Sequence, residues 1–179
     1  AVPKIRSFVK GMKESKVLST SKHFPGYDSW TNSDHQIAFS TSSKEIILRN
    51  VELFKEFADE IPVVMLSSVR FVRLSNTPAV FNPKITAMAR EISPYTVLLT
   101  DDLWGVSLRA WISGTDKVKG KNYPSKDFKK LIRTVLWAKN DMFMITYPAK
   151  AVEMIAYLEW LGKKYPEYRL RIEQAAARI

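Results

Sequence analysis

The chain of 179 residues contains no cysteine. This absence excludes disulfide bonds, thiolate metal sites and a cysteine nucleophile, but it does not fix the compartment. No apolar run reaches the roughly 20 residues that a membrane-spanning helix requires, so we expect no membrane span. A hydrophobic fraction of 46% and a charged fraction of 26% are typical of a globular domain. The length allows one domain with a sizeable core, so residues 1–179 are treated as a single unit.

Acidic residues are fewer than basic ones. The 28 lysines and arginines against 18 aspartates and glutamates give a net charge of +10, which raises the question of a polyanionic partner. The basic residues are spread through segments such as 126–130, KDFKK, where a solvated helix face explains them. The sequence has neither an arginine-rich tract nor an RNP-like aromatic pattern. A nucleic-acid module is therefore the weakest of the readings that we carry forward.

Histidine is scarce, and both histidines, His23 and His35, lie in the segment 21–35, SKHFPGYDSWTNSDH. A short apolar run precedes this segment and a Phe-Pro-Gly corner lies inside it. A strand followed by a Pro-Gly turn and ionisable groups is how an α/β protein presents chemistry at the carboxyl end of a strand. The alternative is a strand-loop junction with solvated polar side chains. The two histidines could share an ion with Asp28 or Asp34, but a loop this polar fits the pattern without one, so no metal site is indicated.

Apolar periodicity and capping residues predict helices that alternate with strands. The expected helices are residues 2–15, 44–59, 82–92, 126–139, 149–164 and 166–179. The expected strands are the buried run 17–24 and the segments 62–69, 96–100 and 142–146. Residues 103–114 read as a loop with a helical turn, and residues 114–125 as an exposed loop. This order predicts right-handed crossovers and a parallel sheet, so the fold class is α/β, and four strands do not close a barrel.

Two of the expected strands end in ionisable groups. Lys22 and His23 end the first, and Asp101 and Asp102 directly follow the apolar run TVLLT at 96–100. Because the carboxyl ends of parallel strands meet at one edge of the sheet, these groups could converge on one pocket. The alternative is that the acids cap a helix or order a loop.

The motifs at these strand ends resemble glycoside hydrolase family 3, and most closely its β-N-acetylhexosaminidase branch. Residues 22–26 read KHFPG, His35 follows in the loop, and residues 100–103 read TDDL. Supporting matches, in the family's own order, are VMLSSV at 64–69, PAVFNP at 78–83 and AKNDM at 138–142. The resemblance covers most of the chain, from about residue 8 to residue 146.

For the fold, the resemblance implies half of a TIM barrel. The chain supplies what look like strands five to eight of the (β/α)8 barrel, and the first four strands have no counterpart in it. We therefore expect residues 1–179 to be one region of βα repeats, the C-terminal half of a glycosidase barrel. The N-terminal half would come from the same longer polypeptide or from a partner chain, since an open parallel sheet exposes backbone groups and apolar faces.

For the chemistry, the resemblance implies retaining hydrolysis of terminal β-linked N-acetylglucosamine or a related sugar. Asp101, the first acid of TDDL, corresponds to the nucleophile that forms a glycosyl-enzyme. Lys22 and His23 correspond to groups that hydrogen-bond the sugar hydroxyls, and Trp104 could supply an apolar wall. Enzymes of this type need no cofactor, and the implied partner is a carbohydrate substrate.

The residues that transfer the proton depart from the family's pattern. In the hexosaminidase branch, an aspartate and a histidine two residues later form the acid/base dyad. His35 falls on the family's histidine, but Ser33 stands where the aspartate should be, and Asp34 lies between them. A slip of the loop by one residue could restore the contact through Asp34, so we take Asp34 and His35 as candidate catalytic residues beside Asp101. The alternative is a catalytically degenerate half barrel that binds sugar without turnover.

Overall fold

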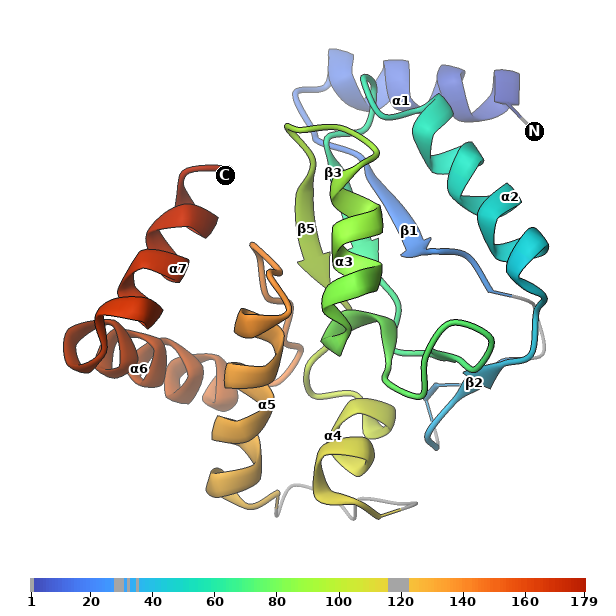
Figure 1. Cartoon of the computed structure of the whole chain (residues 1–179). Coiled ribbons are helices and arrows are strands. Elements are labelled where there is room, and N and C mark those ends of the chain that lie inside the picture. The colour runs from blue at the N-terminus through green and yellow to red at the C-terminus, as the bar shows by residue number, and fades with distance from the viewer. Residues whose placement is uncertain (1, 28–30, 32, 35, 116–122) are drawn as a thin grey trace.

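A computed structural model describes residues 2–27, 31, 33–34, 36–115 and 123–179 of the chain, and it has an α/β fold (Figure 1). The helices are α1 (Val2–Glu14), α2 (Lys44–Glu56), η1 (Ala79–Phe81, a 3-10 helix), α3 (Pro83–Arg90), α4 (Val106–Ser113), α5 (Ser125–Trp137), α6 (Pro148–Lys164) and α7 (Pro166–Ala176). The strands are β1 (Thr20–Phe24), β2 (Phe39–Ser40), β3 (Val63–Leu66), β4 (Arg70–Phe71) and β5 (Val97–Thr100). In the described part of the chain, no helix is both long enough and apolar enough to cross a membrane.

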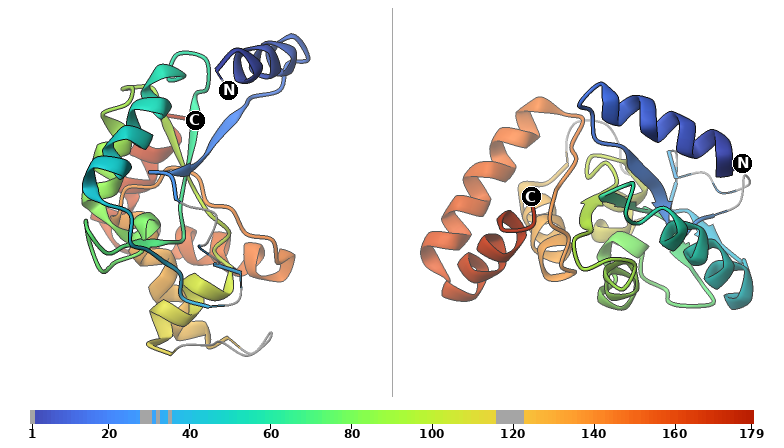
Figure 2. Two further views of the ribbon diagram at one scale, coloured as in Figure 1. Left: turned by 90° about the vertical axis from the view of Figure 1, so that its right-hand side faces the viewer. Right: turned by 90° about the horizontal axis from the view of Figure 1, so that it is seen from above.

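The main sheet has the strand order β1-β3-β5, and all its pairs are parallel. All residues of the central strand β3 are buried, as the continuous apolar run 62–69 predicted. Helix α2 packs on β1 and α3 packs on β5, both on one side of the sheet (Figure 2). The core between these layers consists of fully buried side chains that include Phe24, Leu66, Leu98, Ile47 and Ile85.

The first strand is less buried than the sequence indicated. It starts at Thr20 rather than at residue 17, and only Phe24 of its five residues is buried. Val17 and Leu18 are 48% and 73% exposed. The reason is position, because β1 has β3 as its one neighbour in the described sheet and stands at an edge. An edge strand has a neighbour on one side alone, so more of its surface is exposed than in the central strand β3.

The expected fourth strand at residues 142–146 is wrong, because it reduces to an isolated parallel bridge between Leu99 and Met142. The segment still lies beside β5, since Thr100 N donates to Met142 O at 3.0 Å. Further along, one backbone bond remains, from Leu103 N to Met144 O at 2.9 Å, and side chains make the others. Met144 N donates to Thr100 Oγ1 at 3.0 Å, and Thr146 N donates to a carboxylate oxygen of Asp102 at 3.0 Å. These bonds turn the segment out of strand geometry.

The expectation of a loop and a helical turn at 103–114 is also wrong in part, because α4 occupies Val106–Ser113. Leu108 and Ile112, four residues apart, are buried on the same face of this helix. Arg109 between them hid the apolar pattern, yet it is buried too, because its Nε donates to Trp104 O at 2.8 Å. Gly114 ends the helix at φ 67°, a left-handed conformation that glycine adopts readily. Most of the expected exposed loop, residues 116–122, lies outside the described residues.

Sequence patterns did not predict the pair of two-residue strands β2 and β4. They pair in parallel, Phe39 with Arg70 and Ser40 with Phe71. Strands this short show no readable periodicity. The pair connects the segment after β1 to the segment after β3, next to the carboxyl ends of both strands.

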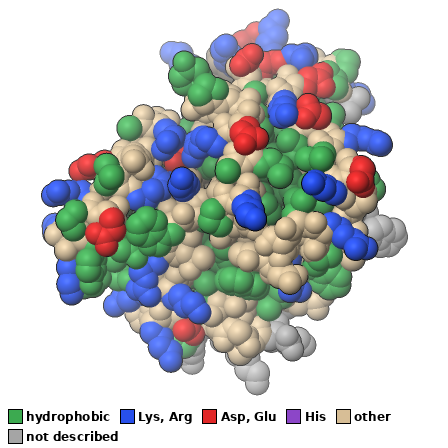
Figure 3. All heavy atoms as spheres, in the orientation of Figure 1, with side chains coloured by type: hydrophobic (Ala, Val, Ile, Leu, Met, Phe, Trp, Pro, Cys, Tyr) green, Lys and Arg blue, Asp and Glu red, His purple; other side chains and the backbone are tan. Residues whose placement is uncertain are grey.

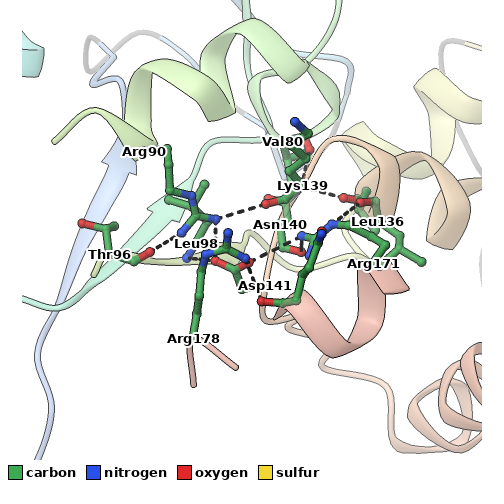
Figure 4. A network of polar contacts seen from close by, with 12 residues as sticks. Val80, Arg90, Thr96, Leu98, Leu136, Lys139, Asn140, Asp141, Arg171 and Arg178 are labelled. Carbon is green, nitrogen blue, oxygen red and sulfur yellow. Dashed lines mark hydrogen bonds and ion pairs between the residues drawn. The ribbon is translucent and has the colours of Figure 1, made fainter. Parts of the chain in front are cut away.

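The buried carboxylate of Asp141 connects the C-terminal helix α7 to the end of the sheet that lies opposite the carboxyl ends of the strands (Figure 4). Asp141 Oδ2 accepts from Leu98 N at 3.0 Å and from Arg90 Nη2 at 2.6 Å. Arg171 and Arg178, from α7 and the segment after it, lie 3.4 and 3.5 Å from Oδ1. Asp141 therefore joins α3, β5 and α7, at the amino-terminal end of β5.

Candidate active site

The carboxylate of Asp101 is fixed at the carboxyl end of β5. Its Oδ2 accepts hydrogen bonds from Ser68 Oγ at 2.6 Å and Ser68 N at 3.3 Å. Its Oδ1 accepts from Asp102 N at 2.8 Å, and the residue remains partly exposed. Donors to an ionised carboxylate form the stronger class of hydrogen bond. Asp101 is therefore a carboxylate held in one orientation and open on one side.

Ser68 is a site residue that sequence reasoning missed. It follows the end of β3, and the register that aligns Leu66 with Thr100 brings it opposite Asp101. Its carbonyl accepts from Ser107 Oγ at 3.5 Å, so the serine is itself supported from α4. The available signal was the pair of serines at the end of a fully apolar strand, next in the chain to the strand that carries the acid.

His23 lies at the end of β1 and faces the same region. Its Nδ1 is 3.1 Å from Tyr27 Oη, and the two rings stack with centroids 5.5 Å apart. Burial lowers the pKa of His23 below its ordinary value, while the charge of Asp101 raises it, that of Lys22 lowers it and that of Asp34 raises it. Because β1, β3 and β5 are parallel, the carboxyl ends of β1 and β5 lie at the same edge of the sheet, with β3 between them. The structure thus brings His23 and Asp101 to one end of the sheet.

Tyr27 is a second residue that the sequence did not single out for the site. Burial raises its pKa, and the negative charges of Asp101 and Asp34 raise it further. Tyr27 therefore keeps its proton near neutral pH, and His23 is mostly neutral there. With both rings neutral, the phenol can donate to Nδ1, which leaves Nε2–H of the imidazole as a donor toward a ligand.

The turn that carries these rings requires a glycine. Gly26 N donates to His23 O at 2.7 Å, and Gly26 has φ 94°. A Cβ at this position would lie 2.9 Å from the side chain of Asn50 on α2. Another residue would therefore push the turn, and with it Tyr27, away from its place.

The remaining candidates at this edge are less well defined. Lys22 is exposed and its charge reaches His23. Asp34 is exposed, and its charge acts on both His23 and Tyr27. His35 lies outside the described residues, so the expected pairing of Asp34 with His35 stays a prediction. Ser33, at the position of the family's aspartate, is partly buried.

The second acid of the pair orders the loop after β5. Asp102 Oδ1 accepts from Trp104 N and from Thr146 N, both at 3.0 Å. Its Oδ2 accepts from Thr146 Oγ1 at 2.6 Å. Asp102 thus holds the loop to the segment beside β5, and this role matches the loop-ordering alternative for one of the two acids.

Trp104 lies partly buried at the same end of the molecule. The guanidinium of Arg109 sits 4.3 Å from its ring centroid, and the ring of Tyr147 is 5.1 Å away. Tyr123 and Phe128 approach edge-on at 6.0 Å. Trp104 is therefore an immobilised aromatic surface rather than a free side chain.

Among the described residues, no group of three or more histidine, aspartate or glutamate side chains could hold a metal ion. The chemistry available at this edge is that of an oriented carboxylate, an imidazole, a lysine and an aromatic surface. Such a set suits a polyhydroxylated ligand, because it offers donors, an acceptor and an apolar face.

The fold is that of an α/β protein with parallel strands, a class in which functional groups usually lie at the carboxyl ends of the strands. Residues 4–119 match the family model described as the glycosyl hydrolase family 3 N terminal domain. The chain belongs to this family, as the motifs at 22–26 and 100–103 predicted.

Several solved structures have a similar fold. A β-N-acetylhexosaminidase from Beutenbergia cavernae superposes with a TM-score of 0.73 at 22% identity, over 96% of this chain and 48% of that one. LpqI of M tuberculosis gives 0.72 at 18% identity, over 96% and 49%. The β-N-acetylglucosaminidase of Thermotoga maritima gives 0.67 at 18%, over 95% and 36%. The chain thus spans about half or less of the length of these proteins, and the likeness shows the fold.

Proposed function

We propose that this chain carries the nucleophile and part of the sugar-binding site of a retaining β-N-acetylhexosaminidase, which cleaves terminal β-linked N-acetylglucosamine or a related sugar. The observation that carries the proposal is the fixed carboxylate of Asp101 beside the His23–Tyr27 pair. Family membership and the fold of the hexosaminidases named above support the substrate class. No cofactor enters the reaction.

In the first step, a carboxylate oxygen of Asp101 bonds to the anomeric carbon as the glycosidic C–O bond breaks. The leaving oxygen takes a proton from the acid, and a covalent glycosyl-enzyme results. Water then attacks the same carbon, gives its proton to the conjugate base and releases Asp101. Ser68 and the Asp102 N–H hold the carboxylate by hydrogen bonds. These donors stay in place when Asp101 loses its negative charge on forming the ester and regains it on hydrolysis.

Sugar recognition is assigned to the residues around the nucleophile. The neutral His23 donates from Nε2 to a hydroxyl, with Tyr27 fixing the ring. Lys22 donates to a second hydroxyl, and the part of Trp104 that remains exposed supplies an apolar wall beside the sugar ring. Asp34 and His35 supply the acid/base in this proposal, with Asp34 near enough to act electrostatically on His23.

The catalytic barrel is completed outside residues 1–179. Two open edges support this part of the proposal: the exposed side of β1 and the irregular segment 142–146 beside β5. In a closed barrel both edges would pair with further strands. We assign the chain as the C-terminal half of the barrel, with the N-terminal half in the same polypeptide or in a partner chain.

A second function follows from one residue. Ser33 stands at the position of the family's dyad aspartate, so the loop could have lost its acid/base while Lys22 and His23 still bind sugar. This alternative is a sugar-binding half barrel without turnover.

The test compares Asp101→Asn with Asp59→Asn in the complete protein, using an aryl β-N-acetylglucosaminide. Asp59 is an exposed acid outside this edge and serves as the matched control. We expect Asp101→Asn to lower kcat/KM by about 10³-fold or more, with the control unchanged. A 2-fluoro glycoside should label Asp101, identified by peptide mass. Unchanged hydrolysis in Asp101→Asn would refute the enzyme assignment, and sugar binding without any turnover would favour the second function.

A further inference from the structure

A second polar centre lies at the opposite end of β5 from Asp101. A hollow of about 480 Å³ is lined by residues from α3, the turn before residue 140 and α7. The lining side chains are Thr86, Ala87, Arg90, Glu91, Lys139, Arg171, Gln174 and Arg178. Lysine and arginine side chains also gather near the C-terminal end of α7 on the face shown in Figure 3. The site proposed for glycoside hydrolysis makes no use of this hollow.

The charges around the hollow do not balance. Arg90, Arg171 and Arg178 converge on the single carboxylate of Asp141, as Figure 4 shows. Lys139 adds a fourth cation, and Glu91 is the one acid among the described residues that line the hollow. Four cations therefore face two anions, and one of these anions is buried beneath the arginines. A local excess of positive charge in a concave site attracts anions.

A buried donor in this cluster is unused. Arg171 is 5% exposed, and its Nη1 has no hydrogen-bond partner among the described residues. Its Nε donates to Leu136 O at 3.1 Å, and its Nη2 donates to Asn140 O at 2.5 Å and to Asp141 Oδ1 at 3.4 Å. An unsatisfied buried donor on a charged group is costly, so its presence in a native fold calls for an explanation.

Mutual repulsion among the arginines points the same way. Burial lowers the pKa of Arg171, the carboxylate of Asp141 raises it, and the charges of Arg178 and Arg90 lower it. Arg171 remains protonated at neutral pH, because the ordinary pKa of a guanidinium is far above it. A further anion in the hollow would relieve this repulsion and accept from the outward-facing donors.

We propose that this hollow binds a phosphate group, with Arg178 and Lys139 as direct donors and Arg171 and Arg90 as the charged floor. A dianion suits this site better than a monovalent ion does, because Arg178 can donate charge-assisted hydrogen bonds to phosphate oxygens and the other three cations compensate the second negative charge. The site is independent of the proposed hydrolysis, since Asp101 and the hollow lie at opposite ends of β5. Its ligand is either free phosphate or the phosphate group of a larger molecule.

The test measures thermal unfolding of the protein at increasing inorganic phosphate, with chloride holding the ionic strength constant. We expect a saturable rise in the unfolding temperature, which Arg178→Gln shifts to about tenfold higher phosphate. Arg169→Gln removes the same charge from α7, the helix that precedes Arg178, at a position 65% exposed and paired with Glu173, and should leave the midpoint unchanged. If Arg178→Gln does not fold, Lys139→Gln provides the same measurement.

Methyl phosphate identifies the source of the phosphate. Binding tighter than that of inorganic phosphate means that the natural ligand carries the group as an ester, and equal or weaker binding means the free ion. A temperature rise no larger than that in chloride, or an equal loss in Arg178→Gln and Arg169→Gln, would overturn the proposal.

Discussion

Replacing Asp141 by asparagine should destabilise the fold strongly, although the shape of the side chain is retained. The carboxylate is 0% exposed and meets Arg90 at 2.6 Å and Arg171 at 3.4 Å, whose side chains are 23% and 6% exposed. Removing one partner of a buried ion pair costs about 3–5 kcal/mol, because the other charge stays buried without compensation. Arg178, at 37% exposure, adds little to this sum, since water screens it.

For a chain of this size, each kcal/mol corresponds to about 2–4 °C, so the unfolding temperature should fall by roughly 6–20 °C. Urea unfolding followed by tryptophan fluorescence and circular dichroism gives the free energy of unfolding directly. Glu173→Gln is the control, because Glu173 and Arg169 are both 65% exposed and should change the free energy by less than about 0.5 kcal/mol. An Asp141→Asn protein within about 1 kcal/mol of the parent would refute the reasoning that this carboxylate compensates the buried arginines.

Two further predictions concern the candidate active site. Ser68→Ala removes the 2.6 Å hydrogen bond to Asp101 and should lower kcat/KM about tenfold. The hydroxyl of Ser67 accepts from Val69 N, so Ser67→Ala should affect stability alone. Steady-state kinetics of both variants tests this difference. In His35→Gln, which leaves one imidazole, NMR should show a midpoint for His23 below 6.5, lower still after Asp101→Asn because a charge that raises this pKa is lost. Since the folded state favours neutral His23, the stability that it contributes is present above pH 6.5 and is lost as the pH falls through the lower folded-state pKa. A midpoint that does not respond to Asp101→Asn would contradict the convergence of the two strand tips.

The sequence predicted correctly those features that depend on the residues of a single strand. The run TVLLT followed by two acids predicted that β5 ends in a carboxylate, and VVML predicted a strand buried along its whole length. It failed at residues 142–146, where the apolar pattern is that of a strand but Thr100 and Asp102 bond the backbone with their side chains. Such competition depends on the neighbouring segment, so no window of local sequence contains it.

Contacts between side chains of different strands could not be predicted from the sequence, for a related reason. Ser68 reaches Asp101 because β3 and β5 pair with Leu66 opposite Thr100, and a shift of one residue would turn Ser68 away. Tyr27 reaches His23 because Gly26 turns the chain back. A single sequence reveals polar residues at strand ends, but register and turn geometry decide which of them meet.

The hydrolase and the sugar-binding interpretations both keep the carboxylate of Asp101. They differ in whether the protein can protonate the leaving oxygen. Asp101 has donors on both oxygens from residues that also hold the fold, namely Ser68 after β3 and the backbone of Asp102, so its orientation does not depend on the loop 21–35. The acid/base residues, by contrast, are proposed from that loop, where Ser33 departs from the family's pattern. A chain could therefore lose the ability to protonate a leaving oxygen and keep both nucleophile and sugar contacts. The fixed geometry of Asp101, the proposed nucleophile, is thus compatible with either function, and the fate of the leaving-group proton separates them.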